Sequence, residues 1–280
     1  MVKLSTVRLG QDRTAAARLQ KKHCVLLPYP DVGALIASGV GWRERAGADT
    51  GERHRLDDVS YAPLILHPSK IVHVGPNYAS RARETGQPLP AAPEFSVRDH
   101  GRVLGAHDDI HLPAEGHHVD MGAELGVVIG RRARGVTAEA ALSHVAGYTV
   151  VNDVTLRGRL DGTPASAPGP QEAVAIPVGP ALVTTDDAPM GGRGLAVSCV
   201  LGGRVTQKAN TTELLFDVAT VIARVSTVVT LLPGDLIATG TPAGAGAGRD
   251  PEVFLRPGTE VVSVIKGVGE LRNAVVRPRS

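Results

Sequence analysis

"VDMGAELGVVIG", residues 119–130, combines the alternation of a β-strand with a continuous apolar run. Because strand side chains have a period of two, Asp120, Gly122 and Glu124 are expected on one face. Two carboxylates on one face would both point into a common site. Glycine at the middle position weakens a strand and marks a bulge or a close backbone approach. The stretch is therefore either an ordinary edge strand or an acidic site that lacks its middle member.

Short apolar runs separated by turn residues continue along the chain. With 33 Gly and 20 Pro among 280 residues, the punctuation is that of a β-rich protein with many turns. Pro-Gly in "LLPGD" and in "LRPGT" predicts a tight turn before the next strand. Strands are predicted at residues 70–75, 123–130, 145–155, 195–203, 235–240 and 259–267.

Few helices are expected. The best candidate is 211–225, where apolar residues recur at helical spacing. Asn210, followed three residues later by Glu213, resembles a capping box for this helix. A shorter helix is predicted from near Thr137, and residues 78–84 are expected to form a short helix or lid.

The length of the chain suits one large domain with a small one attached. Residues 1–60 are less regular, with a helix predicted at 31–39, and are interpreted as a small N-terminal subdomain. Residues 61–280 are then the core of the protein. A polar loop rich in Pro, Gly and Ala is expected at 157–173.

Composition argues against several partners. Aromatic residues make up 3% and the net charge is +2, so neither base stacking nor binding to a polyanion such as nucleic acid is indicated. Arg131, Arg132 and Arg134 are interpreted as a solvated turn. Cys24 and Cys199 form no disulfide framework, which favours a cytoplasmic setting. The absence of a signal-peptide run or a bilayer-spanning segment predicts no membrane partner.

Two sequence features resemble functional motifs but lack the spacing or context that those motifs require. The glycine run "GTPAGAGAG" (240–248) is followed by prolines at 251 and 257 rather than by a helix, so it does not fit a nucleotide fingerprint. Five histidines between residues 100 and 118 lack the spacing of a helical or CxxC-type metal motif and are interpreted as loop surface.

The order of the segments is itself recognisable. It runs from "KIVHVGPNYASRARETG" through "VDMGAELGVVIG", "VAGYTVVNDVT" and "QKANTTELLFDVATVIARVS" to "LLPGDLIATGTPAG" and "FLRPGTEVVSVIKGVGELRN". In sequence and order these segments, from about Pro68 to Asn273, resemble the signature blocks of the fumarylacetoacetate hydrolase (FAH) superfamily. The resemblance implies an α+β, β-rich fold with a mixed β-roll core, a small N-terminal domain and a homodimer.

The resemblance also implies chemistry on β-diketo and α-keto acids. A divalent cation, magnesium or manganese, chelates the keto-enolate oxygens of the substrate in this family. The ion is held by an E-x-E strand pair and by the aspartate of an N-D block, which correspond here to Gly122, Glu124 and Asp153. One of the three ligands is therefore missing, so the resemblance implies a metal site on Glu124 and Asp153 that is weakened, rebuilt or lost.

The catalytic positions of the family's lid are changed as well. The lid usually carries a histidine four residues after the Asn of "NY" and a glutamate three residues further on, which correspond here to Arg81 and Glu84. A guanidinium stays protonated near neutral pH and cannot be an ordinary proton shuttle. The resemblance still assigns Arg81, Glu84 and Thr241 to the catalytic machinery.

Three further family positions have also changed. The lysine of the "F-x-K" block becomes Val97, with Arg98 adjacent, and the lysine of the "G-K-S-F-D" block aligns with Pro170. The aspartate that follows the arginine of the N-D block becomes Gly158, after Arg157.

The Q-x-x-N-T and T-G-T-P blocks, in contrast, are intact. For Asn210 and Gly240, a purely structural role as a helix cap and a turn is an equal alternative. The resemblance predicts a substrate-binding set of Tyr78, Arg98, Arg157, Gln207, Thr239 and Gly240.

Three functional hypotheses follow. The first is metal-dependent hydrolysis or decarboxylation of a β-keto acid, with Asp120, His118 or water filling the vacancy at Gly122. The second is a repurposed, metal-independent pocket that performs tautomerisation, dehydration or cyclisation on a related keto-enol or polyketide-like substrate. The third is a non-catalytic binding or scaffold protein that keeps the fold and the dimer.

The second hypothesis assigns new roles to charged residues. Arg81, Arg98 and Arg157 could clamp a carboxylate or an enolate and stabilise developing negative charge. Glu84 or Glu124, without a cation to lower its pKa, could be poised as a general base.

Overall fold

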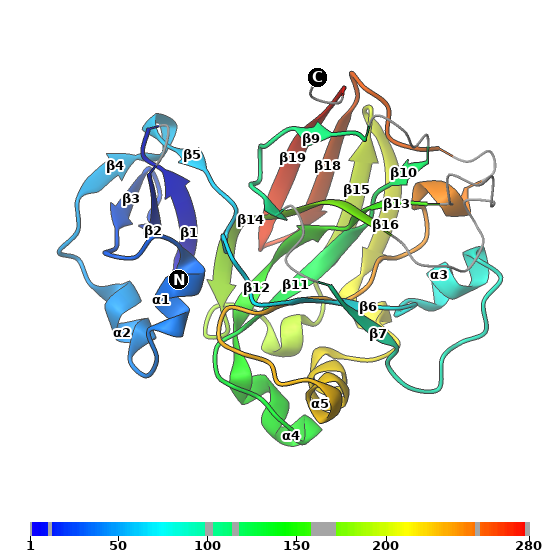
Figure 1. The fold of residues 1–280 in the computed structure, drawn as a ribbon, viewed down its shortest axis with the longest axis horizontal. Coiled ribbons are helices and arrows are strands. Elements are labelled where there is room, and N and C mark those ends of the chain that lie inside the picture. Colours follow the sequence, from blue (N-terminus) through cyan, green and yellow to red (C-terminus); the bar gives the residue numbers. More distant parts are fainter. Residues whose placement is uncertain are drawn as a thin grey trace.

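The computed structural model describes residues 2–10, 13–98, 103–113, 118–157, 172–249 and 253–277. The strands of this part of the chain form two β-sheets (Figure 1). The larger sheet contains, in spatial order, β4 (Arg53–Arg55), β3 (His23–Leu26), β2 (Thr14–Leu19), β1 (Lys3–Arg8), β14 (Glu172–Thr184), β12 (Val145–Asn152), β11 (Ala123–Ile129), β17 (Leu236–Ala238), β6 (Ile71–Val74) and β7 (Phe95–Arg98).

Short strands pair beside this path, namely β5 (Ser60–Tyr61), β8 (Val103–Leu104), β10 (Val119–Asp120) and β13 (Val154–Leu156). The smaller sheet contains β16 (Arg204–Asn210), β15 (Ala196–Leu201), β18 (Glu260–Ile265), β19 (Gly269–Val276) and β9 (Ile110–His111). The described α-helices are α1 (Val32–Ala37), α2 (Trp42–Gly47), α3 (Ala79–Glu84), α4 (Ala138–Ala141) and α5 (Val218–Val228). The predicted β-rich fold with mixed sheets and few helices is confirmed.

The two sheets enclose a common apolar core. Every residue of β11 and β12 is buried, which explains why these strands read as continuous apolar runs rather than as strict alternations. Leu125 and Val150 of the larger sheet belong to the same buried cluster as Val197 and Ile265 of the smaller sheet. The core therefore fixes the ends of β11 and β12 rigidly.

The first sixty residues form the blue lobe in Figure 1, with β1 to β4, α1 and α2. The lobe continues the larger sheet, because β1 pairs antiparallel with β14 through Lys3↔Val183 and Leu4↔Leu182. The division into a subdomain at 1–60 and a core at 61–280 stays a prediction.

The helix predicted at 211–225 was wrong at its start. Asn210 and Glu213 do form a capping box, but they cap a single 3-10 turn at Thr211–Glu213. The chain then extends at Leu214, and α5 begins at Val218, where the Asp217 side chain accepts a hydrogen bond from the Thr220 N–H. Two caps follow each other, and the sequence pattern merged them into one helix.

The predicted strand at 145–155 is divided into β12 and β13, which are separated at Asp153. The predicted strand at 123–130 corresponds to β11, and the residues before it in the opening stretch form a separate short strand, β10, with a break at 121–122. The two breaks face each other, because the Asp153 N–H donates to the Gly122 carbonyl and the Gly122 N–H donates to Asn152 Oδ1. Gly122 therefore marks a break in the sheet between two buried acidic residues, Asp120 and Glu124.

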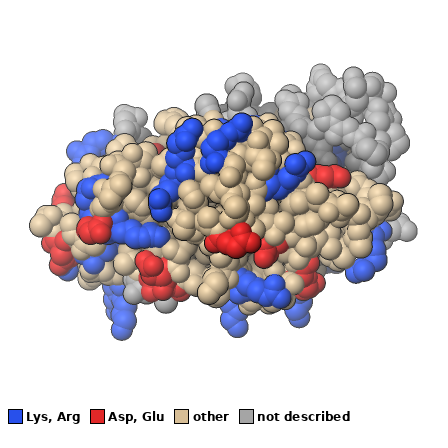
Figure 2. Space-filling view, turned by 90° about the horizontal axis from the view of Figure 1, so that it is seen from below, with Lys and Arg blue, Asp and Glu red and all other residues tan. Residues whose placement is uncertain are grey.

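The surface carries charge of both signs. On the face shown in Figure 2, Lys and Arg side chains are interspersed with Asp and Glu side chains. None of the described helices has the length and apolar character needed to cross a bilayer. Cys24 and Cys199 are both buried and free.

Candidate active site

Five neighbouring strands of the larger sheet, β12, β11, β17, β6 and β7, bring acidic and basic residues together. Glu124 lies at the start of β11, Asp153 follows β12, and His73 lies on β6, where it pairs with Ala238 of the adjacent β17. Arg98 ends β7, which pairs with β6 at the edge of the sheet. These side chains come from segments far apart in sequence and meet because the strands are neighbours.

Glu124, Asp153, His73 and Arg98 form what we call the inner cluster. Glu124 is 4% exposed, and its Oε2 accepts a hydrogen bond of 2.7 Å from the Gly240 N–H. Asp153 Oδ2 lies 3.5 Å from His73 Nδ1, and its Oδ1 lies 3.6 Å from Arg98 Nη1.

Several buried polar atoms of the inner cluster have no hydrogen-bond partner among the described residues. They are both ring nitrogens of His73, Arg98 Nη1 and Asp153 Oδ1. Buried polar groups in native proteins are nearly always hydrogen-bonded, so a concentration of exceptions needs an explanation. A polar ligand that accepts from Arg98 and contacts His73 would satisfy these atoms. The inner cluster therefore has the character of a ligand site.

The pKa values of the two carboxyl groups of the inner cluster are shifted in opposite directions. Burial raises the pKa of Glu124 to about 8, and the nearby charge of Asp153 adds to this effect. Burial also acts to raise the pKa of Asp153, but His73, Arg98 and Arg157 together hold that pKa below its ordinary value. Two neighbouring acids pushed apart in this way supply one proton donor and one permanent anion near neutral pH.

A second group, the lid network, consists of Arg81, Glu84, Asp120 and Arg157. On α3, Arg81 Nη1 donates to Glu84 Oε2 at 2.6 Å. Asp120 Oδ2 accepts from Arg157 Nε at 3.1 Å and lies 4.0 Å from Arg81 Nη2. Arg81 and Glu84, the two residues predicted to be catalytic from the family resemblance, are thus paired with each other. Because its carboxylate is buried between two guanidinium groups, Asp120 is not available to replace the missing acidic residue at Gly122.

The glycine run that was set aside as a nucleotide loop has a different role. Its backbone amides bind the carboxylates of the lid network, since Gly244 N–H donates to Glu84 Oε1 at 2.8 Å and Gly246 N–H donates to Asp120 Oδ1 at 2.5 Å. A Cβ on Gly248 would lie 2.3 Å from Glu84 Cδ. Glycine there allows α3 to close onto the loop.

The space next to Gly122 is filled by Thr241. A Cβ built on Gly122 would lie 2.9 Å from both Cβ and Oγ1 of Thr241. The Thr241 hydroxyl accepts from Gln207 Nε2 at 2.7 Å and donates to the Ala123 carbonyl at 3.2 Å. The vacancy expected from the sequence is therefore closed by a side chain that is held on two sides.

The other predicted binding residues mostly hold the loops around the site. Gln207 Oε1 accepts from the Ala123 N–H, and its Nε2 donates to Thr241 and to the Pro242 carbonyl. The Thr239 hydroxyl donates to the Leu125 carbonyl at 3.0 Å. Tyr78, which is 1% exposed, keeps a hydroxyl with no hydrogen-bond partner among the described residues, and burial raises its pKa. We interpret Gln207 and Thr239 as positioning residues.

The described residues do not fit the divalent ion that the family resemblance implies. Glu124 and Asp153 supply two carboxylates, the third position is Gly122, and the space beside it belongs to Thr241. Within the described ranges, no group of three or more His, Cys, Asp or Glu residues could hold a metal ion. The Arg98 guanidinium already places a positive charge beside Asp153, since its Nη1 lies 3.6 Å from Asp153 Oδ1.

Sequence reasoning missed His73. It is 6% exposed, on a strand whose residues are all buried, and it faces Asp153. The available signal was a lone histidine inside the apolar run "KIVHVG". A titratable residue in a fully buried strand needs a polar or charged partner, and the fold supplies Asp153, which follows β12.

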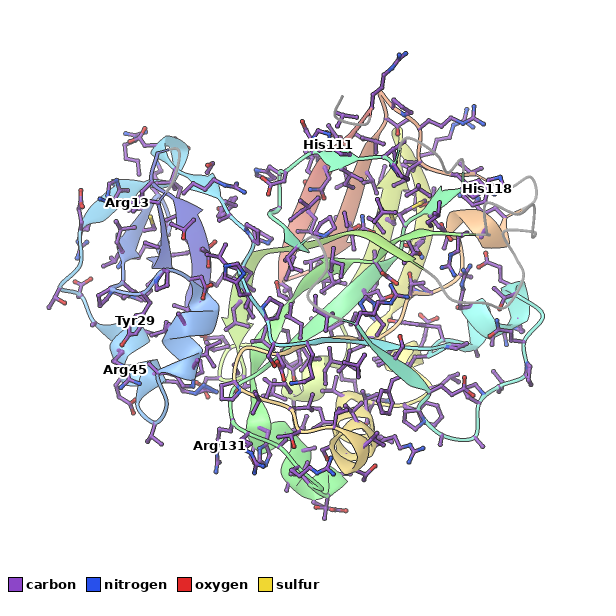
Figure 3. All side chains as sticks on the ribbon, in the orientation of Figure 1. Arg13, Tyr29, Arg45, His111, His118 and Arg131 are labelled. Atoms are coloured by element: carbon purple, nitrogen blue, oxygen red, sulfur yellow. The ribbon has the colours of Figure 1, made fainter. Side chains whose placement is uncertain are left out.

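Two of the histidines that were interpreted as loop surface, His111 and His118, do not lie together. His111 lies on β9, and His118 lies apart from it next to β10 (Figure 3), where its ring packs on Phe254 with centroids 4.7 Å apart. Arg13, Tyr29 and Arg45 lie in the N-terminal lobe (Figure 3). Gly158, Pro170, His100 and His117, which the sequence analysis also considered, lie outside the described residues.

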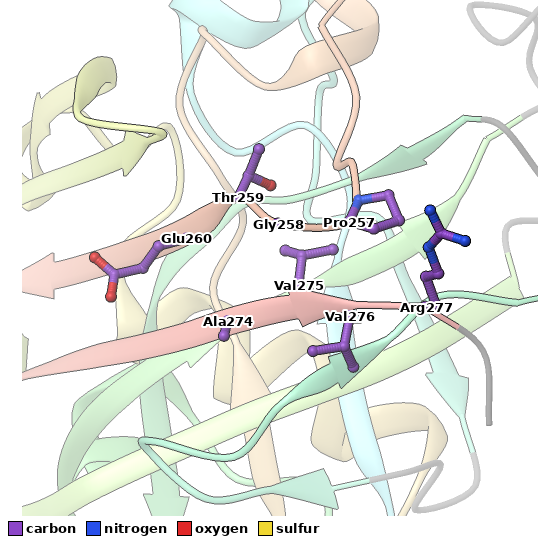
Figure 4. A pocket seen from close by; sticks show the side chains of 8 residues that line it. All are labelled: Pro257, Gly258, Thr259, Glu260, Ala274, Val275, Val276 and Arg277. Atoms are coloured by element: carbon purple, nitrogen blue, oxygen red, sulfur yellow. The ribbon is translucent and has the colours of Figure 1, made fainter.

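A groove of about 570 Å³ lies elsewhere, between the start of β18 and the end of β19 (Figure 4). Its two charged lining residues, Glu260 and Arg277, lie at opposite ends, and Glu260 pairs with Arg272 at 2.6 Å. It contains no residue of the inner cluster, so we do not take it as the active site.

Comparisons with known proteins identify the class. Residues 70–276 match the family described as fumarylacetoacetate (FAA) hydrolase C-terminal, so the chain belongs to the fumarylacetoacetate hydrolase family. The similar proteins described next are enzymes. The mitochondrial oxaloacetate tautomerase FAHD2A of Bos taurus is 39% identical over 221 residues, which are 78% of this chain and 70% of that protein.

Two solved structures are similar over nearly the whole chain. The fumarylacetoacetate hydrolase of Exiguobacterium antarcticum has a TM-score of 0.83 and 28% identity, with 100% of both chains covered. The maleylpyruvate hydrolase of Sphingobium sp. SYK-6, in complex with manganese(II) and pyruvate, has a TM-score of 0.79 and 27% identity, with 99% of this chain and 100% of that chain covered.

The contact between Gly122 and Thr241 can be tested by stability. We expect Gly122→Ala to lower the free energy of unfolding by about 1–3 kcal/mol, because the added Cβ overpacks a closed site. Chemical denaturation measures the loss. In the double variant Gly122→Ala/Thr241→Ala, two of the three close atoms are removed, so the two effects should be strongly non-additive.

Gly47→Ala is the matched control, because a Cβ there meets nothing within 4 Å at the end of α2. This change should be neutral or stabilise by about 0.4–1 kcal/mol. Equal effects of the two single substitutions would show that Thr241 yields freely and that the space at Gly122 is open.

Proposed function

We propose that this protein catalyses the keto-enol tautomerisation of a small 2-oxo acid of the oxaloacetate type. The observation that carries the proposal is the inner cluster, where the carboxyl groups of Glu124 and Asp153 lie beside buried nitrogens of Arg98 and His73 that have no hydrogen-bond partner among the described residues. Ketonisation needs a proton delivered to carbon and a proton removed from the enol oxygen. It needs no activated water.

The residues divide this task. The Glu124 carboxyl, neutral below its raised pKa, delivers a proton to the enol carbon. Asp153, whose lowered pKa keeps it ionised before the reaction, accepts the proton of the enol hydroxyl as the carbonyl forms. Return of that proton to Glu124 completes the cycle, so no atom or electron is consumed. The Gly240 N–H keeps the Glu124 carboxyl oriented.

Tautomerisation fits the changed lid better than hydrolysis does. Hydrolysis of a carbon–carbon bond requires a group that activates water, and the lid position of the family's histidine is Arg81, which is paired with Glu84. A guanidinium does not accept a proton near neutral pH. The name of the Bos taurus relative, oxaloacetate tautomerase, supports the same class of substrate.

The ultraviolet absorbance of enol-oxaloacetate tests the proposal directly. We expect the protein to accelerate the decay of the enol without release of pyruvate. Pyruvate release at a matching rate would make the protein a decarboxylase instead. Saturable binding without turnover of the enol would favour the non-catalytic alternative.

The expectations of a homodimer and of a cytoplasmic location stay predictions. The Bos taurus relative is named as mitochondrial, so its name does not support the cytoplasm. Analytical ultracentrifugation of the purified chain would measure the oligomeric state.

A further inference from the structure

The three arginines near the site differ in what they bind. Arg81 is held by Glu84 at 2.6 Å, and Arg157 is held by Asp120 at 3.1 Å. Arg98 Nη1 is buried and has no hydrogen-bond partner in the described part of the chain, and its ion pair with Asp153 is long, at 3.6 Å. Of these three, Arg98 is therefore the one with a buried nitrogen that lacks a hydrogen-bond partner among the described residues and could donate to a ligand.

Arg98 also lies beside Asp153, one of the two acidic residues at the family metal positions, with 3.6 Å between Nη1 and Oδ1. Its positive charge acts to lower the pKa of Glu124 as well as that of Asp153, so its field covers the space between the two carboxyl groups. A divalent ion placed between them would be repelled by this guanidinium. The third carboxylate that could offset the repulsion is replaced by glycine, and Thr241 closes its place.

We propose that the Arg98 guanidinium replaces the divalent cation in this chain and binds the carboxylate or enolate oxygens of a 2-oxo acid directly. A planar guanidinium presents paired N–H donors that match two oxygens of a carboxylate or a keto-enolate, and its charge is independent of pH in the working range. Donation to a ligand would satisfy Arg98 Nη1, which is otherwise unpaired. The proposal rests on the proposed function for the class of its ligand.

Calorimetry on the metal-free full chain tests this inference without turnover. The probe is oxalate, a planar dianion that resembles the enolate of oxaloacetate. We expect oxalate to bind the wild-type protein in the presence of a chelator. Arg98→Met should weaken oxalate binding about 10–100-fold, since one or more hydrogen bonds to a charged group are lost. Arg98→Lys keeps the charge but not the paired donors, so its loss should be smaller.

Titration with manganese(II) alone tests whether Arg98 excludes a divalent ion from this site. The wild-type protein should show no saturable binding. Saturable binding gained by Arg98→Met would uphold the inference that this guanidinium takes the place of the ion. Arg272→Met is the matched control: Arg272 is about half exposed and pairs with Glu260 and Glu270 on the small sheet. It should change neither titration.

Two outcomes would overturn the proposal. One is oxalate binding by the wild-type protein only when manganese is added, and the other is unchanged oxalate affinity in Arg98→Met with its thermal unfolding intact. If Arg98→Met does not fold, the oxalate affinity of Arg98→Lys decides, and an affinity equal to the wild type contradicts the proposed donor geometry. Arg98-dependent binding of oxalate without enol turnover would uphold this inference while the proposed tautomerase activity fails.

Discussion

Glu124→Gln is expected to reduce tautomerase activity by about 10²–10⁴-fold, the usual contribution of general acid–base catalysis. The amide has the same shape and can still accept a hydrogen bond from the Gly240 N–H, but it cannot deliver a proton. The initial rate of enol decay measures the loss. Glu139→Gln is the matched control, because Glu139 is exposed on α4, and its activity should be unchanged.

The same variant should not be less stable than the wild type. The folded-state pKa of Glu124 is raised from 4.5 to about 8. Between these values the folded protein binds more protons than the unfolded chain does, so this group makes the free energy of unfolding fall as the pH rises. Glutamine does not titrate. The difference in Tm, variant minus wild type, should therefore increase from about pH 5 to about pH 8.

A flat difference in Tm across this range would mean that Glu124 titrates normally. Retained activity in Glu124→Gln would exclude Glu124 as the proton donor. A loss of activity together with a lower Tm at every pH would make Glu124 a structural residue of the β11 terminus.

Asp235→Asn is expected to cost about 3–5 kcal/mol of unfolding free energy, as for a buried charge pair that loses one partner. Asp235 is fully buried, and its Oδ2 accepts from Lys70 Nζ and from the Leu232 N–H, both at 2.7 Å. Its Oδ1 accepts from the Ser69 hydroxyl at 2.5 Å and from the Lys70 N–H. An amide group would place N–H donors against these donors.

Chemical denaturation measures this effect, and Asp186→Asn provides the control. The Asp186 side chain is 75% exposed and 3.8 Å from Arg43, so this substitution should change stability little. Asp235 joins the turn before β17 to the start of β6; His73 lies on β6, and Thr239 and Gly240 follow β17. A loss below about 1 kcal/mol would show that surrounding groups replace these hydrogen bonds.

Much of the fold was predictable because local signals agreed with it. Pro-Gly at 233–234 does precede β17, and the apolar runs at 123–130 and 145–155 do form buried strands. The signals were ambiguous where two short elements follow each other. At Asn210 and Asp217 two caps are only seven residues apart, and apolar spacing alone cannot show that the chain extends between them.

The candidate site was predicted less completely, because its contacts join distant segments. The sequence shows that Asp120 and Glu124 are two positions from Gly122, but the two carboxylates have different partners in the fold. Asp120 accepts from Gly246, 126 residues later, and Glu124 accepts from Gly240, 116 residues later. No local pattern encodes such pairings.

The sequence by itself determined the family, the positions of most strands along the chain and the placement of Gly122 between two acidic residues. Those features depend on residue identity and on spacing along the chain. Only the tertiary structure decided that Thr241 fills the space at Gly122, that His73 faces Asp153, and that Arg98 keeps an unpaired donor. Which buried polar groups are satisfied depends on the packing of strands that are distant in sequence, and that packing exists only in the folded chain.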